Sequence, residues 1–201
     1  MNPLPLPRAL LWDRMVEVGT DLSLVDLRED LLVARGQVVA AEPVAHACRY
    51  TLKTSDGFAT DTLTVESEGA GWQREVRLER SGSSWRVTTS EQGKFGSVQL
   101  PGIVDPGRLS GVLDVDLEAT ALTNTLPIRR LGLLGAAPGT THTVPIAWVR
   151  VPSLQVIPVE QTYTVIDEDT IRYSSGSFTA DLTVDKDGFV VNYPGYASLV
   201  S

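Results

Sequence analysis

The segment 114–131, D-V-D-L-E-A-T-A-L-T-N-T-L-P-I-R-R-L, places charged side chains where the hydrophobic core of a small protein is expected. In a β-strand, Asp114 and Asp116 leave one face while Val115 and Leu117 leave the other. One face of this strand is therefore charged and the other is apolar. We expect the rest of the fold to be arranged around this segment.

The second half of the segment alternates in the same way. Leu126 and Ile128 predict a further stretch of strand, and a bulge is needed to direct the adjacent Arg129 and Arg130. In one interpretation, these arginines form structural ion pairs with the two aspartates and fix the register of the strands. In the other, one or both guanidinium groups bind a carboxylate, a phosphate or a sugar hydroxyl of a ligand.

The composition is that of an ordinary globular protein. The chain has 201 residues, of which 42% are hydrophobic and 21% charged, and we expect a single domain over 1–201. The net charge of -8 argues against nucleic-acid binding, which depends on cationic side chains. The sequence carries no signal for the oligomeric state.

The cellular compartment is inferred from cysteine usage and from the N-terminus. Cys48 is the only cysteine, so no internal disulfide can form. Pro3, Pro5 and Pro7 interrupt the apolar residues of 1–14, which does not resemble a signal peptide. No window approaches the roughly 18 apolar residues of a membrane span. We therefore expect a cytoplasmic protein without a membrane span.

Short alternating segments, separated by Gly, Ser, Asp and Pro, recur along the chain. They predict a mainly β fold, an antiparallel barrel-like sheet with little helix. A helix over 24–32 is the competing interpretation of the first hairpin, 22–40, and we expect one short helical turn in the loop 93–111. The remaining expected strands are 44–52, 58–65, 72–80, 85–89, 141–151, 154–157, 161–166, 171–173, 178–184 and 189–193.

A weak internal repeat relates the two halves, 12–95 and 112–200. Arg49-Tyr50 and the segment 63–69 resemble Arg172-Tyr173 and the segment 182–188. Shared turn chemistry can produce the same match, because Asp-Gly and Glu-Gly pairs favour turns in any hairpin. Two similar halves would fit one barrel-like sheet.

Signs of catalysis, metal binding or cofactor binding are scarce. The chain lacks paired His or Cys residues at zinc-ligand spacing, and it lacks the glycine-rich and nucleophile-elbow motifs of nucleotide-binding proteins and hydrolases. We expect no metal and no cofactor. The residues left for an enzyme are Cys48, which shares a strand face with His46, and the Asp114/Asp116 pair.

Aromatic and amide side chains supply a second set of candidate ligand-binding residues, besides Arg129 and Arg130. Trp148, Tyr163 and Tyr173 could line a cavity whose polar contacts come from tyrosine hydroxyls and from the Gln161 amide. The same rings could instead fill the interior, because small barrels are packed with side chains and wider ones enclose cavities.

The block D-V-D-L…T-N-T-L-P-I-R-R-L resembles the bacterial putative glycolipid-binding family. The resemblance continues through Gln161-x-Tyr163, Arg172-Tyr173 and the segment 178–188 to Tyr193-Pro194-Gly195, and so covers nearly the whole chain. It implies a β-rich, barrel-like fold similar to periplasmic lipoprotein carriers, and binding of a glycolipid or related amphiphile. The chain departs from the family pattern at 112–113 and 121–122.

The main hypothesis is therefore a non-catalytic binder of a lipid, a glycolipid or a similar amphiphile. Its acyl part would lie in the barrel interior, and its head would meet Arg129, Arg130 or the Tyr/Gln group. The alternatives are an enzyme that uses Asp114/Asp116 or Cys48 on a small amphiphilic substrate, and a structural or partner-binding protein.

Overall fold

The structure is a computed structural model that describes residues 7–16, 18–96 and 99–200. Pro3 and Pro5, on which the expectation about the N-terminus partly rests, lie outside these ranges. The first-half strands are β1 (Arg8–Arg14), β2 (Gly19–Leu27), β3 (Leu32–Ala40), β4 (His46–Thr54), β5 (Thr60–Gly69), β6 (Trp72–Ser81) and β7 (Ser84–Gly93). The second-half strands are β8 (Asp114–Leu117), β9 (Thr141–Val149), β10 (Val156–Val165), β11 (Thr170–Ser175), β12 (Phe178–Val184), β13 (Val190–Tyr193) and β14 (Ala197–Leu199).

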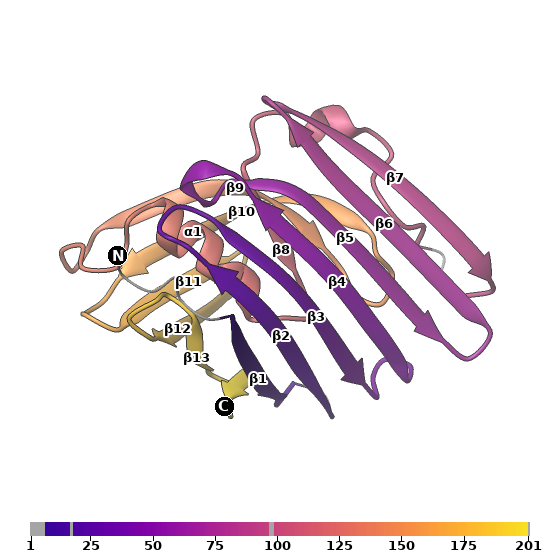
Figure 1. Cartoon of the computed structure of the whole chain (residues 1–201), viewed down its shortest axis with the longest axis horizontal. Coiled ribbons are helices and arrows are strands. Elements are labelled where there is room, and N and C mark those ends of the chain that lie inside the picture. The colour runs from indigo at the N-terminus through magenta and orange to yellow at the C-terminus, as the bar shows by residue number, and fades with distance from the viewer. Residues whose placement is uncertain (1–6, 17, 97–98, 201) are drawn as a thin grey trace.

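All fourteen strands form one sheet in the order β7-β6-β5-β4-β3-β2-β1-β14-β13-β12-β11-β10-β9-β8. The mainly β, antiparallel prediction is confirmed, with one parallel pair between β8 and β9. The sheet curls around the short helix α1 (Thr125–Arg130), so that strands of the two halves lie on opposite sides of it (Figure 1). The sheet is not closed, since β7 and β8 are its two ends.

The two halves of the sheet are joined by the pairing of β1 with β14. Trp12 lies opposite Leu199, and its indole Nε1 donates to the Val190 carbonyl oxygen at 2.8 Å. Sequence analysis missed β14, because three residues are too few for alternation to be recognised. The C-terminal residues thus add a strand between the halves instead of forming a tail.

The expected strand at Leu126 and Ile128 is wrong. These residues lie in α1, which follows the 3-10 helix η3 (Leu122–Asn124) without a break. Pro127 explains why a strand is unfavourable, because proline cannot donate to a central ladder but is tolerated in the first turn of a helix. Residues Thr125 to Ile128 of α1 are all buried, so no exposed polar position in the first turn marks the helical period.

Other differences are local. The hairpin 22–40 forms as β2 and β3, so the competing helix over 24–32 does not occur. The loop 93–111 contains the expected helical turn as η2 (Pro106–Leu109). Phe58 lies in the 3-10 helix η1 (Asp56–Phe58) ahead of β5 instead of beginning the strand. Segments 154–157 and 161–166 merge into β10, which contains Pro158.

The two segments of the weak internal repeat occupy corresponding hairpins. Arg49 and Tyr50 lie in β4, which pairs with β5, and Arg172 and Tyr173 lie in β11, which pairs with β12. The repeat and the single domain over 1–201 remain predictions.

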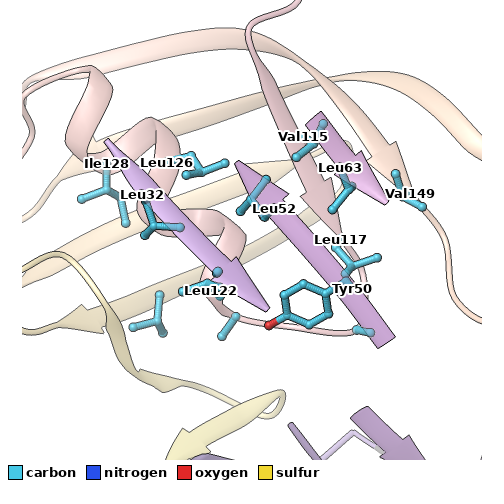
Figure 2. Packing of buried hydrophobic residues seen from close by; sticks show 14 of the residues in the cluster. Leu32, Tyr50, Leu52, Leu63, Val115, Leu117, Leu122, Leu126, Ile128 and Val149 are labelled. Carbon is cyan, nitrogen blue, oxygen red and sulfur yellow. The ribbon is translucent and has the colours of Figure 1, made fainter. Parts of the chain in front are cut away.

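The hydrophobic core lies between the sheet and the segment 122–130. Leu126 and Ile128 of α1 face Leu32 and Leu52 of the first-half strands (Figure 2). Leu122 of η3 lies near the Tyr50 ring in the same view. Much of the interior is thus filled by apolar side chains.

Gly36 allows the Tyr50 side chain to enter this core. A Cβ at position 36 would lie 2.2 Å from Cζ of the Tyr50 ring, so any side chain there would overlap with the ring. The ring covers the backbone of β3 because glycine leaves that space open.

Leu126→Ala tests whether α1 anchors the core. Leu126 is fully buried, so its truncation leaves a cavity and is expected to lower the free energy of unfolding by about 2–5 kcal/mol. Urea denaturation measures this loss. The control is Leu22→Ala on β2, where 41% of the side chain is exposed and the loss should be under about 1 kcal/mol. Equal losses in the two variants would show that α1 is not an anchor.

Candidate functional site

A cavity of about 770 Å³ lies beside the filled core, against the second-half strands. This volume is within the range of about 300–1,000 Å³ that small-molecule sites usually have. Its lining comes from β8 to β13 and from the turns after β8, β11 and β13. The lining residues are Asp116, Glu118, Thr120, Asn124, Trp148, Val159, Glu160, Gln161, Tyr173, Ser175, Gly176, Ser177, Phe178, Tyr193 and Tyr196.

The lining has a buried end and an exposed end. Thr120, Asn124 and Gln161 are buried, and we call this end the floor. The exposed residues Glu160 and 176–178 form the mouth, where 48% of Phe178 is accessible. The mouth therefore opens at the turn between β11 and β12, and polar side chains lie at the buried end.

A chain of hydrogen bonds organises the floor. The Gln161 amide donates from Nε2 to Asp116 Oδ2 at 2.6 Å, and Gln161 Oε1 accepts from the Tyr163 hydroxyl at 2.9 Å. The Asn124 amide donates to the same Tyr163 oxygen at 3.2 Å. The Thr123 hydroxyl donates to Asp116 Oδ1 at 2.9 Å. Each member fixes the orientation of the next, so the floor is rigid before any ligand arrives.

Asp116 is the chemically most unusual group of the cavity. Its carboxylate is half-buried because one side faces the cavity, and protein atoms surround it on the others. Burial raises the pKa of Asp116, and the hydrogen bonds from Gln161 and Thr123 only partly oppose this effect. A desolvated carboxylate with remaining acceptor capacity is suited to receive hydrogen bonds from a ligand.

Tyrosine rings form one side of the cavity. The ring centroids of Tyr163 and Tyr173 are 5.5 Å apart, those of Tyr173 and Tyr193 are 6.0 Å apart, and those of Tyr193 and Tyr196 are 4.7 Å apart. Phe178 extends this cluster to the mouth. Burial raises the pKa of the Tyr173, Tyr193 and Tyr196 hydroxyls, which therefore stay protonated and can donate as well as accept.

The aromatic and amide residues proposed from the sequence gather at this cavity. Trp148, Gln161 and Tyr173 line it, and Tyr163 lies directly behind its floor. Arg129 and Arg130 are not part of the lining.

The two arginines are bound elsewhere in the fold. Arg130 donates from Nε to both oxygens of Asp114, at 3.0 and 3.1 Å, and Asp114 is completely buried. Arg129 donates to the Asp187 carbonyl oxygen at 3.1 Å and stacks on the Phe58 ring, 4.8 Å from its centroid. The described ion pairs include none with Asp116, so the two aspartates of β8 have different environments.

Burial also raises the pKa of Asp114, and the neighbouring Arg130 and Arg80 guanidinium groups oppose this shift. The ion pair joins the start of β8 to the end of α1 across a turn of the chain. The sequence left two interpretations of Arg130, a structural ion pair and a ligand contact. This geometry corresponds to the structural ion pair.

Cys48 does not line the cavity. It is fully buried in β4, and burial together with the negative charge of Asp21 raises the pKa of its thiol to about 12. The thiolate is therefore scarce at neutral pH. His46 contacts the Val44 carbonyl oxygen through Nδ1 at 2.8 Å. Of the three residues considered for catalysis, Asp116 is the one that lines the cavity.

Several lining residues were not identified from the sequence. Asn124 lies in the T-N-T step of the opening segment, and its helical backbone directs the amide to the floor. Tyr193 was grouped with the aromatics but not selected, although Tyr193-Pro194-Gly195 is part of the family resemblance. Glu118 follows β8 and accepts from the Val151 backbone N–H at 2.8 Å. Recognising these residues requires knowing which strands are neighbours.

A second buried carboxylate lies next to the floor. The Thr120 hydroxyl, which lines the cavity, donates to Asp21 Oδ2, and Asp21 Oδ1 is buried without a hydrogen-bond partner. Burial raises the pKa of Asp21 to about 7, against the hydrogen bond from Thr120 and the positive charge of Arg14. This carboxyl group therefore titrates near neutral pH.

Among the described residues, no His, Cys, Asp and Glu side chains gather into a group of three or more able to hold a metal ion. No helix in the described part of the chain is long and apolar enough to span a membrane.

Comparisons with known proteins agree with the fold. Residues 9–198 match the family described as putative glycolipid-binding. The crystal structure of a DUF1089 family protein from Pseudomonas aeruginosa is similar, with a TM-score of 0.65 and 24% sequence identity over 87% of this chain and 89% of that chain. At this identity the likeness shows the fold alone. No curated protein matches the chain.

Arg130→Met tests the Asp114–Arg130 pair. It leaves the Asp114 carboxylate buried without its nearest counterion, and we expect a loss of about 3–5 kcal/mol at pH 7. The pKa of Asp114 rises further in the variant, so acid protonates this carboxylate more readily. The loss in the free energy of unfolding should therefore be smaller in acid. Urea denaturation at pH 7 and pH 5 measures both effects. Arg129→Met is the control and should cost less. A loss that is the same for both variants would contradict the assignment.

Asp21→Asn tests the titration beside the floor. The folded pKa of about 7 exceeds the ordinary aspartate value of 3.8, so the native state keeps a proton that the unfolded chain releases. The stability from this proton is present below about pH 4 and is lost as pH rises through 7. The stability of the variant relative to wild type should increase between pH 4 and pH 8, by on the order of 4 kcal/mol. Denaturation midpoints across this range measure it. A flat difference for Asp21→Asn would refute the shift.

Proposed function

We propose that this chain, which belongs to the putative glycolipid-binding family, binds a glycolipid or similar amphiphile in the cavity beside α1. The observation that carries the proposal is the combination of aromatic walls with a buried polar floor in one cavity. An amphiphile has one part for each kind of surface. Neither a filled interior nor a uniformly polar cleft would suit such a ligand.

The size and the rigidity of the cavity support binding. A preformed site loses little conformational entropy when a ligand enters, so more of the contact energy appears as affinity. The hydrogen bonds among Asp116, Gln161, Tyr163 and Asn124 hold the polar groups in place. Cys48 and Asp114, two of the residues considered for catalysis, have no access to the ligand, which favours a non-catalytic role.

A second candidate is hydrolysis of a glycosidic bond, favoured by the presence of Asp116 and Glu118 in the same cavity. Glycoside hydrolysis uses two carboxyl groups, and an acid with a raised pKa can protonate the leaving oxygen. Release of free sugar from an alkyl glycoside, lost in both Asp116→Asn and Glu118→Gln, would establish this activity. Intact glycoside recovered after prolonged incubation would exclude it.

Ser175→Trp tests the proposed binding. Ser175 lines the cavity near its mouth, so the indole should occupy ligand volume and lower the uptake of amphiphile at least tenfold. Titration with a fluorescent acyl glycolipid, together with native mass spectrometry of gently purified protein, measures the uptake.

Ser174→Trp is the matched control. Ser174 is the preceding residue of β11, so its side chain leaves the opposite face of the strand, where it contacts Thr179. This variant should bind as the wild type does. A wild-type protein that is free of ligand and takes up no glycolipid or fatty acid would refute the proposed function.

A further inference from the structure

The polar side chains of the cavity include buried ones, unlike those of a pocket built for an acyl chain. Thr120, Asn124 and Gln161 are buried at the floor, whereas Phe178 lies at the exposed mouth together with Glu160 and Ser177, and Val159 is partly buried. An acyl chain at the floor would displace water from these polar groups and would offer them no hydrogen bonds in return. Burying unsatisfied polar groups is costly, so the floor disfavours hydrocarbon.

The floor offers hydrogen-bond acceptors to a ligand. The Thr123 hydroxyl and one N–H of each of the Gln161 and Asn124 amides donate to protein oxygens. Each oxygen of Asp116 accepts one bond from the protein, and a carboxylate oxygen can accept more than one. Asn124, whose amide oxygen is an acceptor, also lines the cavity. Hydroxyl groups of a sugar satisfy such a set of acceptors.

The charge of the lining disfavours an anionic head group. The cavity carries the carboxylates of Asp116, Glu118 and Glu160, and none of its described lining residues is Arg, Lys or His. Two guanidinium groups lie over lining aromatic rings. Arg150 lies 5.2 Å from the Trp148 centroid and pairs with Glu118 at 3.8 Å, and Arg14 lies 5.6 Å from the Tyr196 centroid. A phosphate, sulfate or carboxylate on the ligand would be desolvated beside like charges.

We infer that the cavity takes its ligand head-first: an uncharged or amino-bearing glycosyl group lies on the floor, where its hydroxyls donate to Asp116 and Asn124, and the alkyl chain leaves past Phe178. The inference rests on the proposed function and adds the orientation and the class of head group. It reverses the expectation that the acyl part occupies the interior, because that space is filled by α1. The tyrosine rings then cover the C–H faces of the sugar.

The test is a binding series with alkyl glycosides below their micelle concentrations, measured by isothermal titration calorimetry on the full chain. Octyl and decyl glucosides, galactosides and mannosides should bind, and lengthening the chain from octyl to decyl should change the affinity less than about threefold. A chain buried in the cavity would instead gain about fifteenfold from two methylenes. Octyl glucuronide and decanol should bind at least tenfold more weakly than the best octyl glycoside.

Asp116→Asn tests the charge argument. The nearly isosteric amide removes one negative charge from the floor, so the preference for octyl glycoside over octyl glucuronide should fall at least fivefold. Glu29→Gln, at an exposed position between β2 and β3 outside the cavity lining, is the matched control and should leave the preference within twofold. Circular dichroism checks that both variants fold, and Glu118→Gln replaces Asp116→Asn if the latter does not.

The outcomes separate the inference from the proposed function. If no amphiphile binds, with or without a sugar, the proposed function fails. If decanol or the glucuronide binds as tightly as the glycosides, or if affinity rises steeply with chain length, the head-first inference fails while amphiphile binding stands.

Discussion

The fold depends on covering the apolar inner face of a long curved sheet. The segment 122–130 lies between the two halves of the fourteen-stranded sheet and packs against its apolar inner face. Leu122, Leu126 and Ile128 supply the apolar contacts. The segment does not extend along the whole interior. The part that it leaves unfilled, against the second-half strands, is the cavity, so core packing and the candidate site have the same origin.

The two aspartates of β8 illustrate how one local pattern serves two purposes. Asp114 is directed to the end of α1, where Arg130 neutralises it and the pair ties strand to helix. Asp116 lies two residues further along β8, beyond the filled core. Its partners are the uncharged Gln161 and Thr123. A carboxylate bonded only to neutral donors keeps its charge available to a ligand. The difference arises from what the opposite side of the fold supplies, not from the strand itself.

Buried carboxyl groups connect the cavity to the stability of the fold. Asp116 faces the ligand space, and Asp21 is linked to it through Thr120, which lines the floor. Burial raises the pKa of both groups, so each is destabilising when ionised. Such groups persist when the site they build is useful, since a core of apolar residues would be more stable. The polar floor is thus a departure from optimal packing at a place where binding is proposed.

The sequence by itself determined the mainly β fold, the family and most of the strands, because alternation and turn residues are local signals. It also selected Trp148, Gln161 and Tyr173, which the cavity brings together. Tertiary structure alone decided that Leu126 and Ile128 are helical and that β14 joins the halves. It also decided that Asp116 faces a cavity and Asp114 does not. These features depend on which distant segments become neighbours. Side-chain period fixes the face of a strand, but the partner across the interior determines whether that face is filled, paired or left open.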